Sequence, residues 1–230
     1  PPFYREFRRL DGEVLTQTPA QRSFHIIAGG DVVFRLWGRP FKLFAEGYYK
    51  SLWDLIPYQL ENVRIRYRPD LPGTDGHVYG ADARVNGQFI RGVDSWFSVS
   101  YLRAKEKVPG VDEEYVPRPT DQRLTVSMYF QDEIPKLPQM KGHINLVHAS
   151  GLPFGPPEFF PNRSAFTAPY YNRVDIGVSY NLVFRDEGMR KKPFGLESLW
   201  LGLEVFNIFA RANTVSYQWI TDTFGTQIAV

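Results

Sequence analysis

The sequence predicts an all-β protein of about eight long antiparallel strands. Apolar and polar residues alternate with a period of two along most of the chain, and the 3.6-residue period of an amphipathic helix hardly occurs. Short and long connections take turns between the alternating runs. These observations indicate strands that run up and down, with tight turns at one end of the sheet and long loops at the other.

Each predicted strand has an apolar face and a polar face, as a period of two requires. The pattern is clear in RLTVSMYFQ, where Val126 and Met128 flank Ser127. The strands are predicted at 22–36, 41–52, 77–88, 93–105, 121–132, 141–150, 173–184 and 198–208. Tight turns are predicted at 37–41, 89–92, 133–139 and 185–197, and long loops at 53–75, 107–119, 151–172 and 210–230.

The loop at 151–172 opens with GLPFGPPEFFP, in which four prolines and two glycines exclude both a helix and a central strand. One interpretation is that the prolines hold Phe154, Phe159 and Phe160 in place for contact with a substrate. The other is that they stiffen the base of the loop where the chain reverses. The second is favoured, because the Pro-Gly core lies next to the strand rather than at the loop tip.

Composition excludes several classes of function. The net charge of +2 gives no strong field for nucleic acid, and the absence of cysteine excludes disulfides and thiol chemistry. The four histidines lie in separate segments without metal-ligand spacing, so neither a metal nor a cofactor is expected. No catalytic motif is present, and an enzyme is not predicted. The chain opens with PPFYREFRRLDG, which does not resemble a signal peptide.

Alternating antiparallel strands fit either a soluble sandwich or a transmembrane barrel. Strand length favours the barrel, because a tilted strand needs about 9–11 residues to cross a membrane. Aromatic residues near strand ends, such as Trp37, Tyr49 and Tyr101, are typical of membrane interfaces. Charged residues also occupy mid-strand positions on the polar face, which a lumen would accommodate: Arg35, Glu46, Asp82, Arg84, Asp175 and Glu204.

Longer motifs carry a family resemblance. The runs PRPTDQR (117–123), GLPFGPP (151–157), RVDIG (173–177) and LGLEVFNIF (201–209) are the most specific, and the similarity extends over essentially the whole chain. Together they resemble the C-terminal part of the barrel of a TonB-dependent outer-membrane receptor. The resemblance implies eight strands of a larger up-and-down barrel of about 22 strands.

The resemblance further implies active uptake of a scarce nutrient, such as an iron chelate, cobalamin, a glycan or a peptide, across the outer membrane of a Gram-negative bacterium. Its partners would be membrane lipid, a plug domain of the same full-length chain and, through it, the TonB complex. The tight turns would face the periplasm and the long loops the exterior. A family member also has a signal peptide, a plug and a final strand with a terminal aromatic residue. We therefore expect this chain to be a fragment; the substrate and any lipoprotein partner stay open.

Candidate site residues are few. VRIRYR (63–68) alternates basic and apolar residues, so Arg64, Arg66 and Tyr67 could meet an anionic ligand, or the run could be a hairpin with a solvated face. Phe159 and Phe160 are weaker loop candidates. For PRPTDQR, a structural role is favoured over binding, with Asp121 accepting hydrogen bonds from backbone groups.

The six mid-strand charges are expected to pair with one another or with the plug, because charges inside a barrel need partners. Two alternatives to the transporter are kept. One is a small self-contained outer-membrane barrel, acting as an adhesin, a structural protein or an enzyme. The other is a soluble β-sandwich that acts as a binding module.

Overall fold

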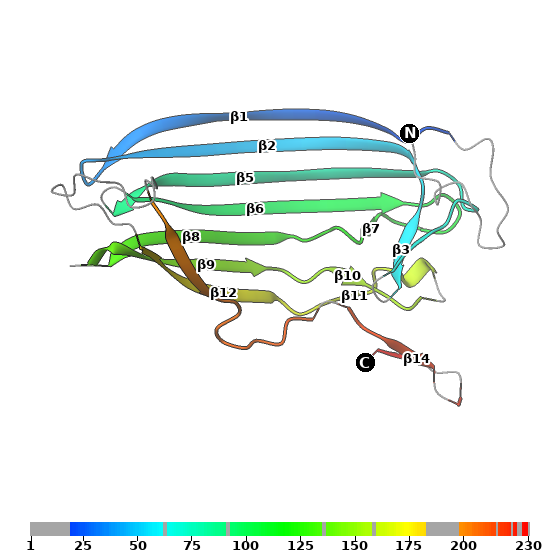
Figure 1. Ribbon diagram of the computed structural model, residues 1–230. Helices are drawn as coiled ribbons and strands as arrows, with labels where there is room; N and C mark the ends of the chain where they lie inside the picture. Colours follow the sequence, from blue (N-terminus) through cyan, green and yellow to red (C-terminus); the bar gives the residue numbers. More distant parts are fainter. Residues whose placement is uncertain are drawn as a thin grey trace.

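The computed structural model describes residues 19–61, 64–90, 93–134, 137–157, 160–182, 198–214, 216–221, 223–224 and 227–229. Within these residues the chain forms one large antiparallel sheet and three small hairpins. Figure 1 shows the long strands side by side, with the short strands gathered near one end. The predicted all-β class and antiparallel meander are confirmed.

The long strands pair in the order of the sequence. They are β1 (Arg22–Leu36), β2 (Arg39–Leu55), β5 (Thr74–Ile90), β6 (Val93–Lys107), β8 (Leu124–Ile134), β9 (Leu137–Ala149), β12 (Tyr171–Asn181) and β13 (Trp200–Val205). A short strand, β7 (Val116–Pro117), also pairs with β6. Within the described residues the sheet is open, with β1 and β13 at its edges. Each predicted range overlaps one long strand, although β2 and β5 are longer than predicted, at 17 residues each.

The small hairpins all belong to the long connections. They are β3 (Tyr58–Glu61) with β4 (Arg64–Tyr67), β10 (Pro153–Phe154) with β11 (Phe166–Thr167), and β14 (Trp219–Thr221) with β15 (Gln227–Ala229). A 3-10 turn, η2 (Phe160–Asn162), follows β10. The end of the sheet near these hairpins is called the loop end. The opposite end, where β1 turns into β2, is called the turn end (Figure 1).

The register places the apolar residues of all eight long strands on one side, here called the apolar face. A single row crosses seven strands through paired positions: Val32, Leu43, Val85, Phe97, Met128, Leu146 and Val174. On β13, Leu203 and Val205 continue this face opposite Val178 and Ile176. A slip of one residue would turn a strand's apolar side chains to the other side, so the alternation fixes the register.

The apolar face is largely uncovered. Phe24, Val32 and Leu203 are 57%, 54% and 75% exposed. Deeply buried side chains lie instead near the ends of the sheet, such as Phe41 at the turn end and Val108 at the loop end. Within the described residues no second layer packs on the large sheet, so its apolar side chains do not form an ordinary core between two layers.

The turn between β1 and β2 is two residues long and has the geometry of a type I′ hairpin. Trp37 and Gly38 both have positive φ, at 54° and 73°, and Leu36 pairs with Arg39 across the turn. This turn type matches the twist of the strands but requires left-handed backbone at both positions.

Replacing Gly38 with valine is expected to destabilise this hairpin by about 1 kcal/mol, because a β-branched residue resists positive φ. Space is not the cause, since a Cβ at Gly38 meets nothing within 4 Å. Gly38→Asn, which tolerates the left-handed region, is the control. Hydrogen exchange at the Leu36 and Arg39 amides measures the effect, and equal exchange in the two variants would contradict it.

Candidate functional site

The opposite side of the sheet, here called the polar face, collects the mid-strand charges predicted from the sequence. Glu46 and Asp82 are paired positions, and Asp175 and Glu204 fall on the same side through Asn145 and Gly177. All six predicted residues share this face: Arg35, Glu46, Asp82, Arg84, Asp175 and Glu204. The shared face follows from the register and from the period of two.

Asp175 on β12 is the most enclosed of these charges, with 1% of its surface exposed. Its carboxylate accepts hydrogen bonds from Arg173 at 2.8 Å, from Asn145 at 3.2 Å and from the Asn207 backbone N–H at 2.9 Å. Asn207 follows β13, so Asp175 joins three consecutive strands. This role is structural, since the carboxylate is occupied by its own sheet.

An aromatic row crosses the polar face from β5 to β13. The Arg84 guanidinium lies 4.7 Å from the Trp96 ring, and Trp96 stacks at 6.5 Å on Tyr129. Tyr129 stacks at 5.7 Å on His143, whose Nε2 lies 3.4 Å from a Glu204 carboxylate oxygen. The strand β12 lies between His143 and Glu204, and its residue at this point is Gly177. A Cβ there would lie 2.1 Å from the His143 ring, so a larger residue would block the contact between His143 and Glu204.

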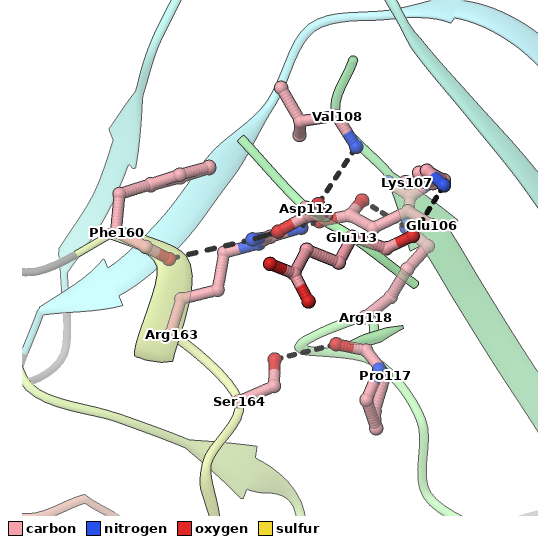
Figure 2. Close-up of polar contacts among 10 residues, drawn as sticks. All are labelled: Glu106, Lys107, Val108, Asp112, Glu113, Pro117, Arg118, Phe160, Arg163 and Ser164. Atoms are coloured by element: carbon pink, nitrogen blue, oxygen red, sulfur yellow. Dashed lines mark hydrogen bonds and ion pairs between the residues drawn. The ribbon is translucent and has the colours of Figure 1, made fainter. Parts of the chain in front are cut away.

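A second polar group joins the loops at the loop end, and Figure 2 shows it. Arg163, which follows η2, donates two hydrogen bonds of 2.8 Å to the two oxygens of Asp112 and one of 3.1 Å to Glu106. Arg118 lies 3.3 Å from the other Glu106 oxygen. Phe160 lies under the Arg163 guanidinium at 4.4 Å. We call these five residues the loop-end cluster.

The cluster is almost completely removed from solvent. The side chains of Arg163, Glu106 and Asp112 are 0%, 1% and 2% exposed. Burial opposes the charge on Arg163, but the hydrogen bonds and charges of Asp112 and Glu106 outweigh it and raise the pKa of the guanidinium above its ordinary value. Two carboxylates around one bidentate arginine form a closed group with a firm geometry. We infer that it holds the loops together.

Two sequence motifs acquire structural roles here. In PRPTDQR, the Asp121 carboxylate accepts a 2.6 Å hydrogen bond from the Ala104 backbone N–H, which is a structural role as expected, although the donor belongs to the strand β6 and not to the turn around Asp121. In GLPFGPP, a Cβ at Gly151 would lie 1.6 Å from the Ala168 carbonyl oxygen, and one at Gly155 1.8 Å from that of Asn162. The two glycines therefore allow the two sides of this loop to touch, and the Phe154 ring stacks at 4.3 Å on Tyr217.

The ligand candidates from the sequence are dispersed. Arg64 and Arg66 are exposed on β4, where the predicted hairpin is present, and Tyr67 is half-buried. Phe160 is buried, at 5% exposure. Besides Arg163, the Arg68 guanidinium lies over its ring, at 5.4 Å from the ring centroid. Phe159 lies outside the described residues.

Sequence reasoning missed Glu106, Asp112 and Arg163. Arg163 is separated from its two acidic partners by 57 and 51 residues, and no local pattern connects them. The one signal was the alternation of β6, which placed Glu106 on the polar side of a strand end.

The loop end also has a small hollow lined by Leu152, Phe154, Tyr217 and Trp219, among others. Its volume of about 50 Å³ holds only a few water molecules. The hollow is therefore a gap between packed aromatic rings rather than a site for a nutrient.

Comparison of the chain with family models, curated proteins and solved structures finds no match. No group of three or more histidine, cysteine, aspartate or glutamate side chains in the described part of the chain is placed to hold a metal ion. Over the same residues, no helix has the length and hydropathy needed to cross a membrane.

Proposed function

We propose that this chain forms part of the wall and the outer loops of an outer-membrane transporter that takes up a scarce nutrient with energy from TonB. The observation that carries the proposal is the continuous apolar face, which is in register across eight strands and largely exposed. Monomeric soluble proteins rarely leave so large an apolar surface open to water. A lipid-facing wall of a barrel needs this surface.

Aromatic belts at both ends of the apolar face support a membrane position. Tyr49, Tyr79 and Tyr101 lie towards the loop end and are 47%, 40% and 44% exposed. At the turn end Phe41 contacts Phe34 and Phe89, at 5.7 and 5.0 Å between ring centroids. Aromatic side chains gather at the two interfaces of transmembrane barrels.

The distance between the belts fits a bilayer. On β5, Tyr79 and Phe89 are ten residues apart, which corresponds to about 33 Å along an extended strand. A tilt of about 40° reduces the height to about 25 Å, which is the height of the apolar band of outer-membrane barrels.

The polar face would then line the lumen, where its charges meet water, one another or a plug. Among the described residues β1 and β13 have one unpaired edge each, and this favours a larger barrel, because lipid does not tolerate exposed backbone groups and neighbouring strands would pair with them. Transport, the TonB complex and the outer membrane come from the family resemblance. In that mechanism the loops bind the nutrient outside and movement of the plug admits it.

Single-cysteine labelling tests the membrane part of the proposal. These 230 residues contain no cysteine, so once any cysteine elsewhere in the complete reading frame is replaced with serine, a label reports one position only. Val126 and Ser127 are adjacent on β8, are both half-buried and lie on opposite faces. Val126→Cys and Ser127→Cys, made in the complete reading frame that contains this chain and reconstituted in vesicles, each carry an environment-sensitive fluorophore.

We expect a nitroxide on the lipid chains to quench the label at position 126 and aqueous iodide to quench the label at position 127. A soluble sandwich, with its apolar face against a second layer, would shield position 126 from both quenchers. Transport is tested separately, by loss of growth on the scarce nutrient when the gene is deleted. Normal growth of the deletion strain on iron chelates, cobalamin, glycans and peptides would contradict the uptake role.

A further inference from the structure

On the apolar face of strand β6, the side chains change from apolar to cationic after Tyr101. On the apolar face, Phe97, Val99 and Tyr101 are followed at the same spacing of two residues by three cations: Arg103, Lys105 and Lys107. The other face of the same segment ends in the buried residues Ala104 and Glu106. The cations therefore continue the line of the apolar side chains beyond Tyr101, and the first of them, Arg103, is in register with the belt residue Tyr79.

Neighbouring strands leave much of this charge uncompensated. Arg103 is paired in register with Tyr79 and Lys105 with His77, neither of which is acidic. The acidic residue in register is Asp75, opposite Lys107, whose Nζ donates to the Glu113 backbone carbonyl oxygen at 2.5 Å. Arg103 Nε is buried and has no hydrogen-bond partner among the described residues.

We propose that Arg103 and Lys105, with Lys107 beside them, bind the phosphate groups of anionic lipids in the leaflet next to the loop end. Tyrosines in an aromatic belt lie at the level of the lipid headgroups, so Arg103, in register with Tyr79, and Lys105 beyond it are at the level of the phosphates. A guanidinium matches phosphate oxygens with a two-pronged donor, and an ammonium adds a point charge. The three cations project from the apolar side of β6, whereas Glu106 of the loop-end cluster projects from its other side.

The inference rests on the proposed membrane position of the apolar face, and its chemistry selects a lipid. A soluble anion or an acidic protein segment would have no use for the apolar row beneath the cations. A phosphorylated lipid uses both parts, because its acyl chains cover Phe97 and Val99 while its headgroup reaches Arg103 and Lys105.

Lipid selectivity tests the site. The protein from its complete reading frame is purified in a neutral detergent, and binding of phosphatidylglycerol and of phosphatidylcholine is measured by native mass spectrometry. Each cation near an anionic headgroup is worth roughly a fivefold change in affinity. We expect the double variant Arg103→Gln/Lys105→Gln to bind phosphatidylglycerol about 25-fold more weakly, and to lose much less affinity for phosphatidylcholine, whose choline cation offsets the phosphate charge.

The matched control is Arg64→Gln/Arg66→Gln, which removes the same charge from the hairpin β3–β4 at the loop end. Equal weakening in the control, or none in the test variant, would overturn the lipid site. If the double variant does not fold, Lys105→Gln alone must still lose roughly fivefold. If the lipid nitroxide quenches the label at position 126 but the protein binds phosphatidylglycerol and phosphatidylcholine equally, only the lipid site is rejected. Failure of that quenching rejects the membrane position and the lipid site together.

Discussion

Replacing Arg163 with methionine is expected to separate the loops that the loop-end cluster holds together. Removing one partner from a buried ionic group costs about 3–5 kcal/mol, because the remaining charges stay buried without compensation. Here Glu106 and Asp112, which are 1% and 2% exposed, would lose their shared guanidinium. Native-state hydrogen exchange at the Val111 and Arg118 amides should accelerate by two to three orders of magnitude, following roughly tenfold per 1.4 kcal/mol.

Arg123→Met is the matched control for this prediction. Arg123 also faces a buried carboxylate, that of Asp121, but its side chain is 51% exposed and the ion pair is long, at 3.6 Å. Because Arg123 is half-exposed, the ion pair is long and Asp121 keeps its hydrogen bond from the Ala104 backbone N–H, exchange should change much less than in Arg163→Met. A combined variant, Arg163→Met with Glu106→Gln and Asp112→Asn, should recover part of the loss, because it leaves no buried charge of the trio. Equal effects of Arg163→Met and Arg123→Met would show that the cluster does not join the loops.

Replacing Gly155 with alanine is expected to disrupt the same region by a steric route. The added Cβ would lie 1.8 Å from the Asn162 carbonyl oxygen and 2.7 Å from the Arg163 carbonyl carbon. Both are backbone atoms, so no rotamer change relieves the clash, and the cost should reach about 3 kcal/mol, the upper part of the overpacking range. Hydrogen exchange at the Arg163 and Ala165 amides, which bond to Phe160 and Asn162, measures the loss.

Gly30→Ala provides the control, because a Cβ at Gly30 on β1 meets nothing within 4 Å. Its effect should stay within about 0.5 kcal/mol, as for an ordinary surface change. If the Arg163 and Ala165 amides of the Gly155→Ala variant exchange at the wild-type rate, the two sides of the loop do not touch in solution.

The class and order of the fold could be predicted because the period of two is a local property. The alternation around Val126, Ser127 and Met128 already states which side chains share a face, and the structure preserves that division across the sheet. The tight turn at 37–41 was equally readable, because Gly38 next to Trp37 allows a two-residue hairpin. Strand ends were less predictable, since β2 continues past its alternating run to Leu55 after a register shift near Asp54.

Of the two candidate sites, one could be predicted from the sequence and the other could not. The charges on the polar face were predicted together, because each needs only its own strand's alternation and the common register. The loop-end cluster was not, because the contacts of Arg163 with Glu106 and Asp112 join two loops far apart in sequence. GLPFGPPEFFP showed that its loop was stiff but not that Gly155 lies against Asn162 or that Phe160 is buried beneath Arg163.

By itself the sequence determined an all-β chain of antiparallel strands with one apolar and one polar face, since side-chain direction in a strand follows residue number. Only the tertiary structure decided which loops touch, which charges are buried and which cations stand beyond Tyr101 without an acidic neighbour on β5. Those properties depend on pairs of residues brought together by strand pairing and loop packing, and no local spacing encodes such pairs.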